Sequence, residues 1–274
     1  MPDIAELIEL LGLHDKQVAH ELGRPEEEVH LGTPFELVGD RMIIGDVHLP
    51  TTRYGIADLV ARVAQKHLKR PRILTIAGDL FNFDRFSPFS AVIQAPSWEC
   101  ELLAAKALIK RWLETFDQIE MISGNHDRRL QKVLAGEMSE ETFSGLIYGN
   151  SDKFRLSNYG WCTIRSGGVS WRVTHPKNYS INQLVTADTL ASKFQSNIIS
   201  FHEHHLSMGW DRYKNFIIVN GGSLADERQI PYMTLDDNKA SRSAPGFVML
   251  KNGTPYLFGE PPFTDYSHWK ITMS

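Results

Sequence analysis

The chain has 274 residues and a formal net charge of -4, and its pI of about 6.3 gives no sign of a large nucleic-acid surface. Hydrophobic residues make up 42% of it, which supports a normal core and excludes a disordered chain. No apolar run reaches the roughly 20 residues of a membrane span, and no secretory signal is visible. Two cysteines are too few for a disulfide framework. We therefore expect a reduced, cytoplasmic protein without a membrane partner.

The first 34 residues have a helical pattern that is separate from the rest. Apolar residues recur there at helical spacing, and Leu22, Gly23 and Val29 fall where a helix-turn-helix places its packing residues. A helix that reads DNA is usually basic, whereas the second helix here opens with the three glutamates 26–28. We therefore expect residues 1–34 to be a helical appendage for packing or docking, between copies of the chain or with a protein partner. Residues 35–274 then form the main domain.

Strands and helices alternate in the first part of this domain. Apolar strands at 41–48, 72–79 and 118–123 enclose amphipathic helices at 56–68 and 98–116. Strand, helix and strand in this order predict parallel βαβ units and an α/β fold.

The second half of the domain has a stronger β character. Gly167-Gly168 and Asn252-Gly253 are turn sequences, and each separates two short apolar strands, which predicts two hairpins. Between these hairpins we expect a helix at 181–194 and short strands at 197–201 and 216–219.

Side chains that bind metals stand at the carboxyl ends of successive predicted strands. Open α/β sheets place their ligand crevices at such ends. Taken singly, an Asp after a strand is often a helix cap, and a buried His is often a core residue. Because these residues recur at one strand end after another, we favour a shared site. The residues are Asp46, His48, Asp79, Asn125, His126, His175, His202 and His204.

The donor types indicate a pair of divalent ions. Imidazoles with carboxylate and amide oxygens suit Mn, Fe, Zn or Ni. Even seven of these side chains as ligands are too many for one catalytic ion that keeps an open position. They suit two ions about 3.5–4 Å apart that share a carboxylate, clamp a phosphate and activate a hydroxide. The sequence thus predicts a phosphoesterase with two divalent ions, Mn being expected and Fe, Zn, Ni or Mg being alternatives.

The ordered motifs Asp-x-His, Gly-Asp, Gly-Asn-His-Asp, His and His-x-His resemble the calcineurin-like metallophosphoesterase superfamily over residues 41–223. The resemblance implies a β-sandwich of two mixed sheets flanked by helices. It implies that the first metal is held by Asp46, His48 and His204. Asp79 would bridge the metals, and the second metal would be held by Asn125, His175 and His202. His126 would be the catalytic histidine that contacts the phosphate or protonates the leaving oxygen.

Departures from the family pattern bear on the substrate. Phosphatase-like members carry Gly-Asp-x-x-Asp-Arg at the second junction, where the later Asp supports the histidine. Asn82 stands at that position here, with Asp84 as a candidate replacement. The Gly-Asp-Leu-Phe stretch is more similar to the double-strand-break repair nucleases. Many members also have Gly before the last His-x-His, where this chain has Phe201.

These features favour a phosphodiesterase or nuclease that acts on nucleic acid or nucleotides. The alternatives are a phosphomonoesterase or protein phosphatase and, from another class, a non-catalytic DNA-binding or docking module. Phenylalanines 81, 83, 86 and 89 either stack on a base or pack in the core. Arginines near the motifs suit phosphate contacts. The candidate substrate-binding residues are Asn82, Asp84, Arg85 and Arg128.

Overall fold

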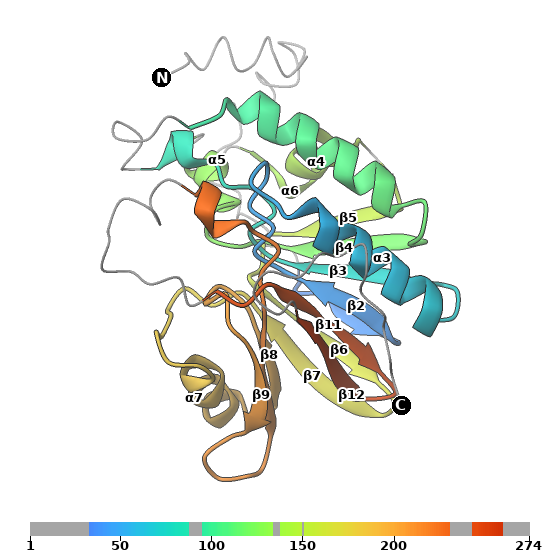
Figure 1. Cartoon of the computed structure of the whole chain (residues 1–274), viewed down its shortest axis with the longest axis vertical. Coiled ribbons are helices and arrows are strands. Elements are labelled where there is room, and N and C mark those ends of the chain that lie inside the picture. Colours follow the sequence, from blue (N-terminus) through green and yellow to red (C-terminus); the bar gives the residue numbers. More distant parts are fainter. Residues whose placement is uncertain (1–32, 88–94, 134–137, 150, 231–242, 260–274) are drawn as a thin grey trace, which may run out of the picture.

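The computed structural model describes residues 33–87, 95–133, 138–149, 151–230 and 243–259. The helical appendage expected over residues 1–34 lies almost wholly outside them. Two six-stranded mixed sheets form the centre of the molecule, and helices flank them (Figure 1). This architecture confirms the predicted fold class. No helix among the described residues is long and apolar enough to cross a membrane.

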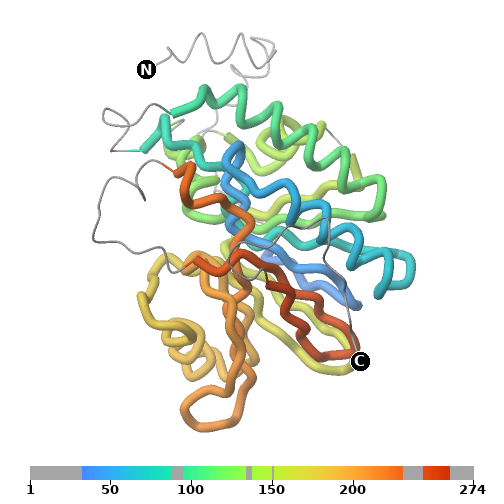
Figure 2. Tube along the Cα trace, viewed as in Figure 1, coloured from blue at the N-terminus to red at the C-terminus, as the bar shows by residue number. Residues whose placement is uncertain are grey.

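The first sheet carries the predicted βαβ units. Its order is β12-β11-β2-β3-β4-β5, and β2 to β5 pair in parallel. The C-terminal hairpin of β11 and β12 returns to pair antiparallel with β2, as the red strands beside the blue one show (Figure 2). The strand bounds are β2 Arg41–Ile44, β3 Ile73–Ala77, β4 Gln118–Ile122, β5 Phe154–Ser157, β11 Gly246–Lys251 and β12 Thr254–Gly259.

The second sheet has the order β1-β6-β7-β8-β10-β9. The predicted hairpin is present, because β6 and β7 pair antiparallel, while β8 lies parallel to both β7 and β10. The strand bounds are β1 Glu36–Val38, β6 Trp161–Ser166, β7 Val169–Thr174, β8 Asn197–Ser200, β9 Leu206–Trp210 and β10 Ile217–Gly221.

Helices cover the outer face of each sheet. Those on the first sheet pack their apolar stripes against it in a large buried cluster, and α7 packs on β8 and β10 through Ala187 and Ala191. Among the described residues, two short 3-10 turns and α5 lie in the connections. The bounds are α3 Tyr54–His67, η1 Asp84–Phe86, α4 Trp98–Trp112, α5 Arg128–Val133, α6 Glu140–Tyr148, α7 Val185–Phe194 and η3 Glu227–Gln229.

A second apolar core fills the space between the sheets. In β2, the side chains of Met42 and Ile44 pack toward the helices, whereas Ile43 packs toward the opposite sheet. Successive strand residues face opposite sides, so a strand covered on both faces is apolar throughout. Trp171 and Val173 of β7 meet Ile43 in this inter-sheet cluster. Both sheets are therefore fixed against each other, and their strand ends are held in register at one edge of the sandwich.

Candidate metal centre

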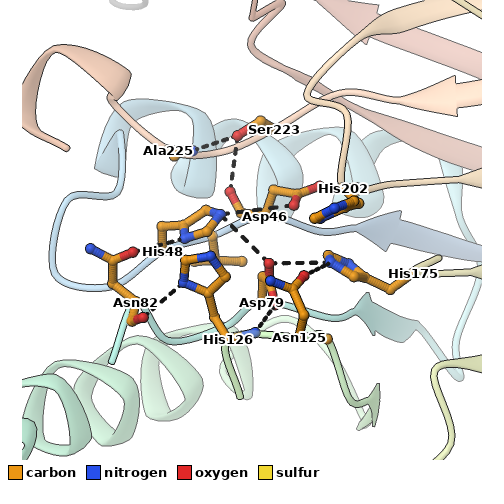
Figure 3. A network of polar contacts seen from close by, with 12 residues as sticks. Asp46, His48, Asp79, Asn82, Asn125, His126, His175, His202, Ser223 and Ala225 are labelled. Atoms are coloured by element: carbon orange, nitrogen blue, oxygen red, sulfur yellow. Dashed lines mark hydrogen bonds and ion pairs between the residues drawn. The ribbon is translucent and has the colours of Figure 1, made fainter. Parts of the chain in front are cut away.

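The predicted metal-binding side chains come together at the carboxyl ends of strands from both sheets. Asp46 and His48 follow β2, Asp79 follows β3, and Asn125 follows β4, all in the first sheet. From the second sheet, His175 follows β7, and His202 and His204 follow β8. Figure 3 shows the labelled members of this group pointing toward one another. The donor atoms of their Asp and His side chains form overlapping clusters, and within each cluster the atoms lie within 4.8 Å of one another. One of these clusters joins His126 to His48 and Asp79.

Backbone strain is concentrated at these residues. Asp46, His48 and Asp79 have φ angles of 50°, 49° and 53°, and His202 and His204 have 81° and 56°. A residue with a side chain rarely adopts this left-handed region, and each instance costs about 1–3 kcal/mol. Hydrogen bonds between the two loops support it, since the Val47 and His48 N–H groups both donate to the Asp79 carbonyl. Such outliers cluster at functional sites.

Glycines make room for the close approach of these loops. A Cβ on Gly124 would lie 2.1 Å from Asp79 Oδ1. Phe201, which replaces the glycine that many family members carry, is accommodated in the same way. Its ring lies 2.5 Å from the position of a Cβ on Gly45 and 2.3 Å from that of a Cβ on Gly221. The small residues on the neighbouring strands therefore compensate for the larger one.

The two aspartates occupy different positions in the cluster. Asp46 Oδ1 lies 3.3 Å from His204 Nε2 and 3.8 Å from His48 Nε2. Asp79 Oδ2 lies 3.2 Å from His175 Nε2 and 3.9 Å from His48 Nε2. Asp79 thus sits between imidazoles that the family resemblance assigns to different ions, which is the position a bridging carboxylate needs. Asn125 Oδ1 lies 3.0 Å from His175 Nε2.

The outer ring nitrogens of three histidines are held by partners behind the cluster. His204 Nδ1 lies 2.6 Å from Glu227 Oε1, and His48 Nδ1 lies 3.2 Å from Asn82 Oδ1. His175 Nδ1 lies 3.0 Å from the carbonyl oxygen of Ala77. A partner on one nitrogen fixes the ring and directs the other nitrogen to a metal. In each of these rings, Nε2 faces the cluster.

Two observations show that the donor set fits divalent cations. First, the buried atoms Asp46 Oδ1 and His48 Nε2 make no hydrogen bond among the described residues, although Asp46 Oδ1 lies 3.3 Å from His204 Nε2. Second, although burial opposes charge, the Asp79 carboxylate raises the pKa of His175 to about 9 and the Asp46 carboxylate raises that of His204 to about 10. Protonated imidazoles therefore balance carboxylates that a bound cation would otherwise neutralise.

His126 lies beside the cluster in a different setting. Its Nδ1–H donates to the backbone carbonyl of Asn82 at 2.8 Å, and its ring meets that of His48 edge-on at 4.7 Å between centroids. Burial lowers the pKa of His126 to about 3. The imidazole is therefore neutral, and Nε2 is the atom that remains to act on a substrate. Arg129 Nη2 lies 3.3 Å from this nitrogen.

The candidate substrate-binding residues are placed differently. Asn82 and Asp84 are buried beside the cluster, where Asn82 Nδ2 donates to Asp84 Oδ2 at 2.6 Å. Arg85 is exposed on η1. Arg128 points to the loop before β6, where its Nη2 donates to the Asn158 carbonyl at 2.8 Å. The structure thus brings Asn82 and Asp84 to the centre and directs Arg128 elsewhere.

Two of the phenylalanines in the same loop pack in the core and do not offer a surface for base stacking. Phe81 and Phe83 are fully buried and stack on each other at 4.4 Å between ring centroids. They pack in the core, so neither ring is available to a base. Phe86 is half-buried, and Phe89 lies outside the described residues.

Several residues with evident roles were not predicted from the sequence. Arg129 contacts His126, and Glu227 holds His204. Asp127 belongs to the Gly-Asn-His-Asp motif, but the sequence did not indicate a role for it. Its carboxylate accepts from the N–H groups of Asp79 and Gly124, both at 2.8 Å. Asp127 therefore ties the β3 loop to the β4 loop, and its place directly after His126 was the one available signal.

The fold and the centre together define a metallophosphoesterase-type α/β sandwich. The model of the calcineurin-like phosphoesterase family matches residues 41–239, and the chain belongs to that family. This finding confirms the resemblance at the level of the superfamily. No curated protein sequence matches the chain.

Solved structures with similar folds are distant in sequence. Hypothetical protein PH1004 from Pyrococcus horikoshii OT3 is 9% identical over 81% of this chain and 87% of that chain, with a TM-score of 0.49. Vps29 from Chaetomium thermophilum is 10% identical over 82% and 96%, with a TM-score of 0.39. Protein AQ665 from Aquifex aeolicus, described as of unknown function, is 15% identical over 71% and 98%, with a TM-score of 0.37.

Proposed function

We propose that this protein is a two-metal phosphodiesterase that acts on nucleotides or nucleic acid, with Mn as the expected ion. Asp46, His48 and His204 would hold one ion, Asp79 would be shared between the two, and Asn125, His175 and His202 would hold the other. When bound, the ions neutralise the phosphoryl oxygens and supply the activated water that attacks the ester. His126 faces the phosphoryl group from the side of the leaving oxygen.

The observation that carries the choice of a diester is the partner of His126. Its Nδ1 is held by the neutral backbone carbonyl of Asn82, and the nearby charge of Arg129 is paired with Asp84 at 2.7 Å. A phosphomonoester carries close to two negative charges at neutral pH, whereas a diester carries one. Because His126 is not held by a carboxylate and is not cationic, its side of the site suits a diester, which carries less negative charge than a monoester.

An exposed aromatic ring beside the centre supports a nucleoside leaving group. Tyr179 is 71% exposed, and its ring meets that of His202 edge-on at 5.8 Å between centroids. The loop that carries it is anchored to the His202–His204 turn, because Ser180 N–H donates to Glu203 Oε1 at 2.6 Å. An exposed ring on an anchored loop is a surface on which a base stacks.

The overall charge favours small or single-stranded substrates. A net charge of -4 disfavours the extensive phosphate contacts that duplex binding needs. We therefore expect turnover of nucleotides, single strands or ends in preference to long duplex. The junction at 78–81 also resembles the repair-nuclease branch, and that placement stays a prediction.

A screen of the Mn-supplemented protein tests the proposal. The substrates are a phosphomonoester, a bis-ester, cyclic nucleotides, a phosphopeptide, and single- and double-stranded DNA. We expect the diesters to be hydrolysed faster than the monoesters. Turnover of phosphopeptide or monoester at least tenfold faster than every diester would show instead that the protein is a phosphatase.

Metal analysis separates this enzyme from a non-catalytic docking module. Protein purified without chelators and then supplied with Mn should contain about two ions per chain. A chain that takes up none would overturn the catalytic proposal as a whole.

A further inference from the structure

The two terminal nitrogens of the Arg129 guanidinium have different surroundings. Its Nη1 donates to Asp84 Oδ1 at 2.7 Å and to the Asn82 carbonyl at 2.8 Å. Asp84 is itself fixed by the side-chain amide of Asn82. The Arg129 side chain is 19% exposed. This anchorage fixes the plane of the guanidinium and leaves its second nitrogen, Nη2, directed at His126.

The hydrogen bond between Arg129 and His126 has a defined direction. A guanidinium has only donors, so His126 Nε2 must accept from Arg129 Nη2 across the 3.3 Å between them. His126 Nδ1 carries the ring proton, which it donates to the Asn82 carbonyl. An incoming acceptor that displaces His126 Nε2 can take the Nη2–H, because a contact of 3.3 Å is long for such a bond.

We propose that Arg129 binds a phosphoryl oxygen of the substrate, and that the substrate phosphate displaces His126 Nε2 from Arg129 Nη2. This inference rests on the proposed function and identifies the cation that holds the non-bridging oxygen. Arg suits this task because its planar fork binds an anchoring carboxylate with one nitrogen and an anion with the other.

The neighbouring arginines differ from Arg129 in this respect. Arg128 Nη2 is engaged with the Asn158 carbonyl, and Arg85 is exposed. The sequence nominated these two for the phosphate, but Arg129 is the one whose guanidinium contacts His126. The sequence motif alone could not show which of the adjacent residues Arg128 and Arg129 contacts the phosphate. Their hydrogen-bond partners distinguish them.

Phosphate binding by the full-length, Mn-loaded protein tests the inference. The readouts are the dissociation constant of inorganic phosphate by calorimetry and KM and kcat on the best ester of the screen. Arg129→Gln should weaken phosphate binding and raise KM by about tenfold or more, as expected for the loss of one charge-assisted hydrogen bond. Metal content should remain that of the wild type, since Arg129 contacts no metal-binding carboxylate in the cluster.

A matched control separates a specific contact from a loss of charge. Lys132 is exposed on the same helix, α5, and Lys132→Gln removes the same charge. We expect this variant to bind phosphate within about twofold of the wild type. Equal affinities of Arg129→Gln and Lys132→Gln would refute the inference, as would a larger loss for Arg128→Gln.

A second variant guards against a folding defect. Removal of Arg129 alone leaves the buried Asp84 carboxylate unpaired, which is destabilising. The double variant Asp84→Asn with Arg129→Gln restores neutrality and should show the same loss of phosphate affinity in a folded, metal-loaded chain. If the wild type hydrolyses no ester, the proposed function fails, while phosphate binding still decides the role of Arg129.

Discussion

At the scale of single residues, the orientation of the imidazoles depends on the groups behind them. Glu227 holds His204 through a 2.6 Å contact, whereas the adjacent Asp226 pairs with Arg228 at 2.8 Å. Glu227→Gln should weaken Mn binding by about tenfold or more, because supporting residues typically contribute 10–100-fold. Asp226→Asn should leave Mn affinity unchanged. Calorimetric titration of both variants with Mn measures these affinities. Equal Mn affinities of the two variants would contradict the prediction.

Substitution of Asp79 should reduce metal binding, whereas substitution of His126 should reduce turnover. Asp79 Oδ2 lies between His175 and His48, so Asp79→Asn should reduce the bound metal from about two ions to fewer than one. His126→Gln should keep both ions and mainly lower kcat. Elemental analysis combined with kinetics distinguishes the two outcomes. Equal metal loss in both variants would show that His126 is a ligand.

The candidate metal-binding residues could be predicted from the sequence because each lies within a few residues of the end of a predicted strand. Asp46, Asp79 and Asn125 could be found from this local pattern alone. Glu227 could not, since it reaches His204 from 23 residues away after an intervening strand pair. Arg129 was missed for a related reason, because only the folded loop places Asp84 and His126 on either side of its guanidinium.

At the scale of elements, helix α4 carries a buried acid that fixes the loop after β3. Glu101 Oε2 accepts from the N–H groups of Asn82 and Phe83 at 2.9 and 2.8 Å. Burial, against the effect of these two hydrogen bonds, raises the pKa of Glu101 from 4.5 to about 8. The folded chain therefore retains a proton that the unfolded chain has released between these pH values.

This shift predicts a pH-dependent contribution to stability. A group with a raised folded-state pKa contributes fully below its unfolded pKa, and the contribution is lost as the pH rises through about 8. Glu101→Gln removes the titration and keeps an acceptor for both N–H groups. Urea unfolding at pH 5, 7 and 9 should therefore show the wild type losing stability relative to this variant as the pH rises. Parallel curves for the two proteins would exclude the effect.

The long, regular elements could be predicted from the sequence, and several short ones could not. Strands β2, β3 and β4 are largely apolar and are buried on both faces, and α3 and α4 show clear apolar stripes. Strand β9 has exposed Met208 and Trp210 and an internal Gly209, so no pattern of burial marked it. Strand β5 is a four-residue edge strand, whose identity depends on its pairing with β4 rather than on its own composition.

At the scale of the whole molecule, the candidate metal centre joins the two sheets. Asp46, His48, Asp79 and Asn125 belong to the first sheet, whereas His175, His202 and His204 belong to the second. A direct contact already crosses this boundary, because His202 N–H donates to Asp46 Oδ2 at 2.9 Å. Bound cations would add further links between the sheets, and the unfolded chain has no comparable site.

Metal binding should therefore stabilise the entire sandwich. A ligand that binds only the folded state at 100 times its dissociation constant adds about 2.7 kcal/mol, which corresponds to a rise in Tm of roughly 5–10 °C for a chain of this size. Mn should produce this rise in the wild type, and EDTA should reverse it. His126→Gln should keep the full rise because its metals remain, whereas Asp79→Asn should lose most of it. Thermal unfolding of the three proteins with and without Mn measures the effect. A rise in Asp79→Asn equal to that of the wild type would place the stabilising ions outside this centre.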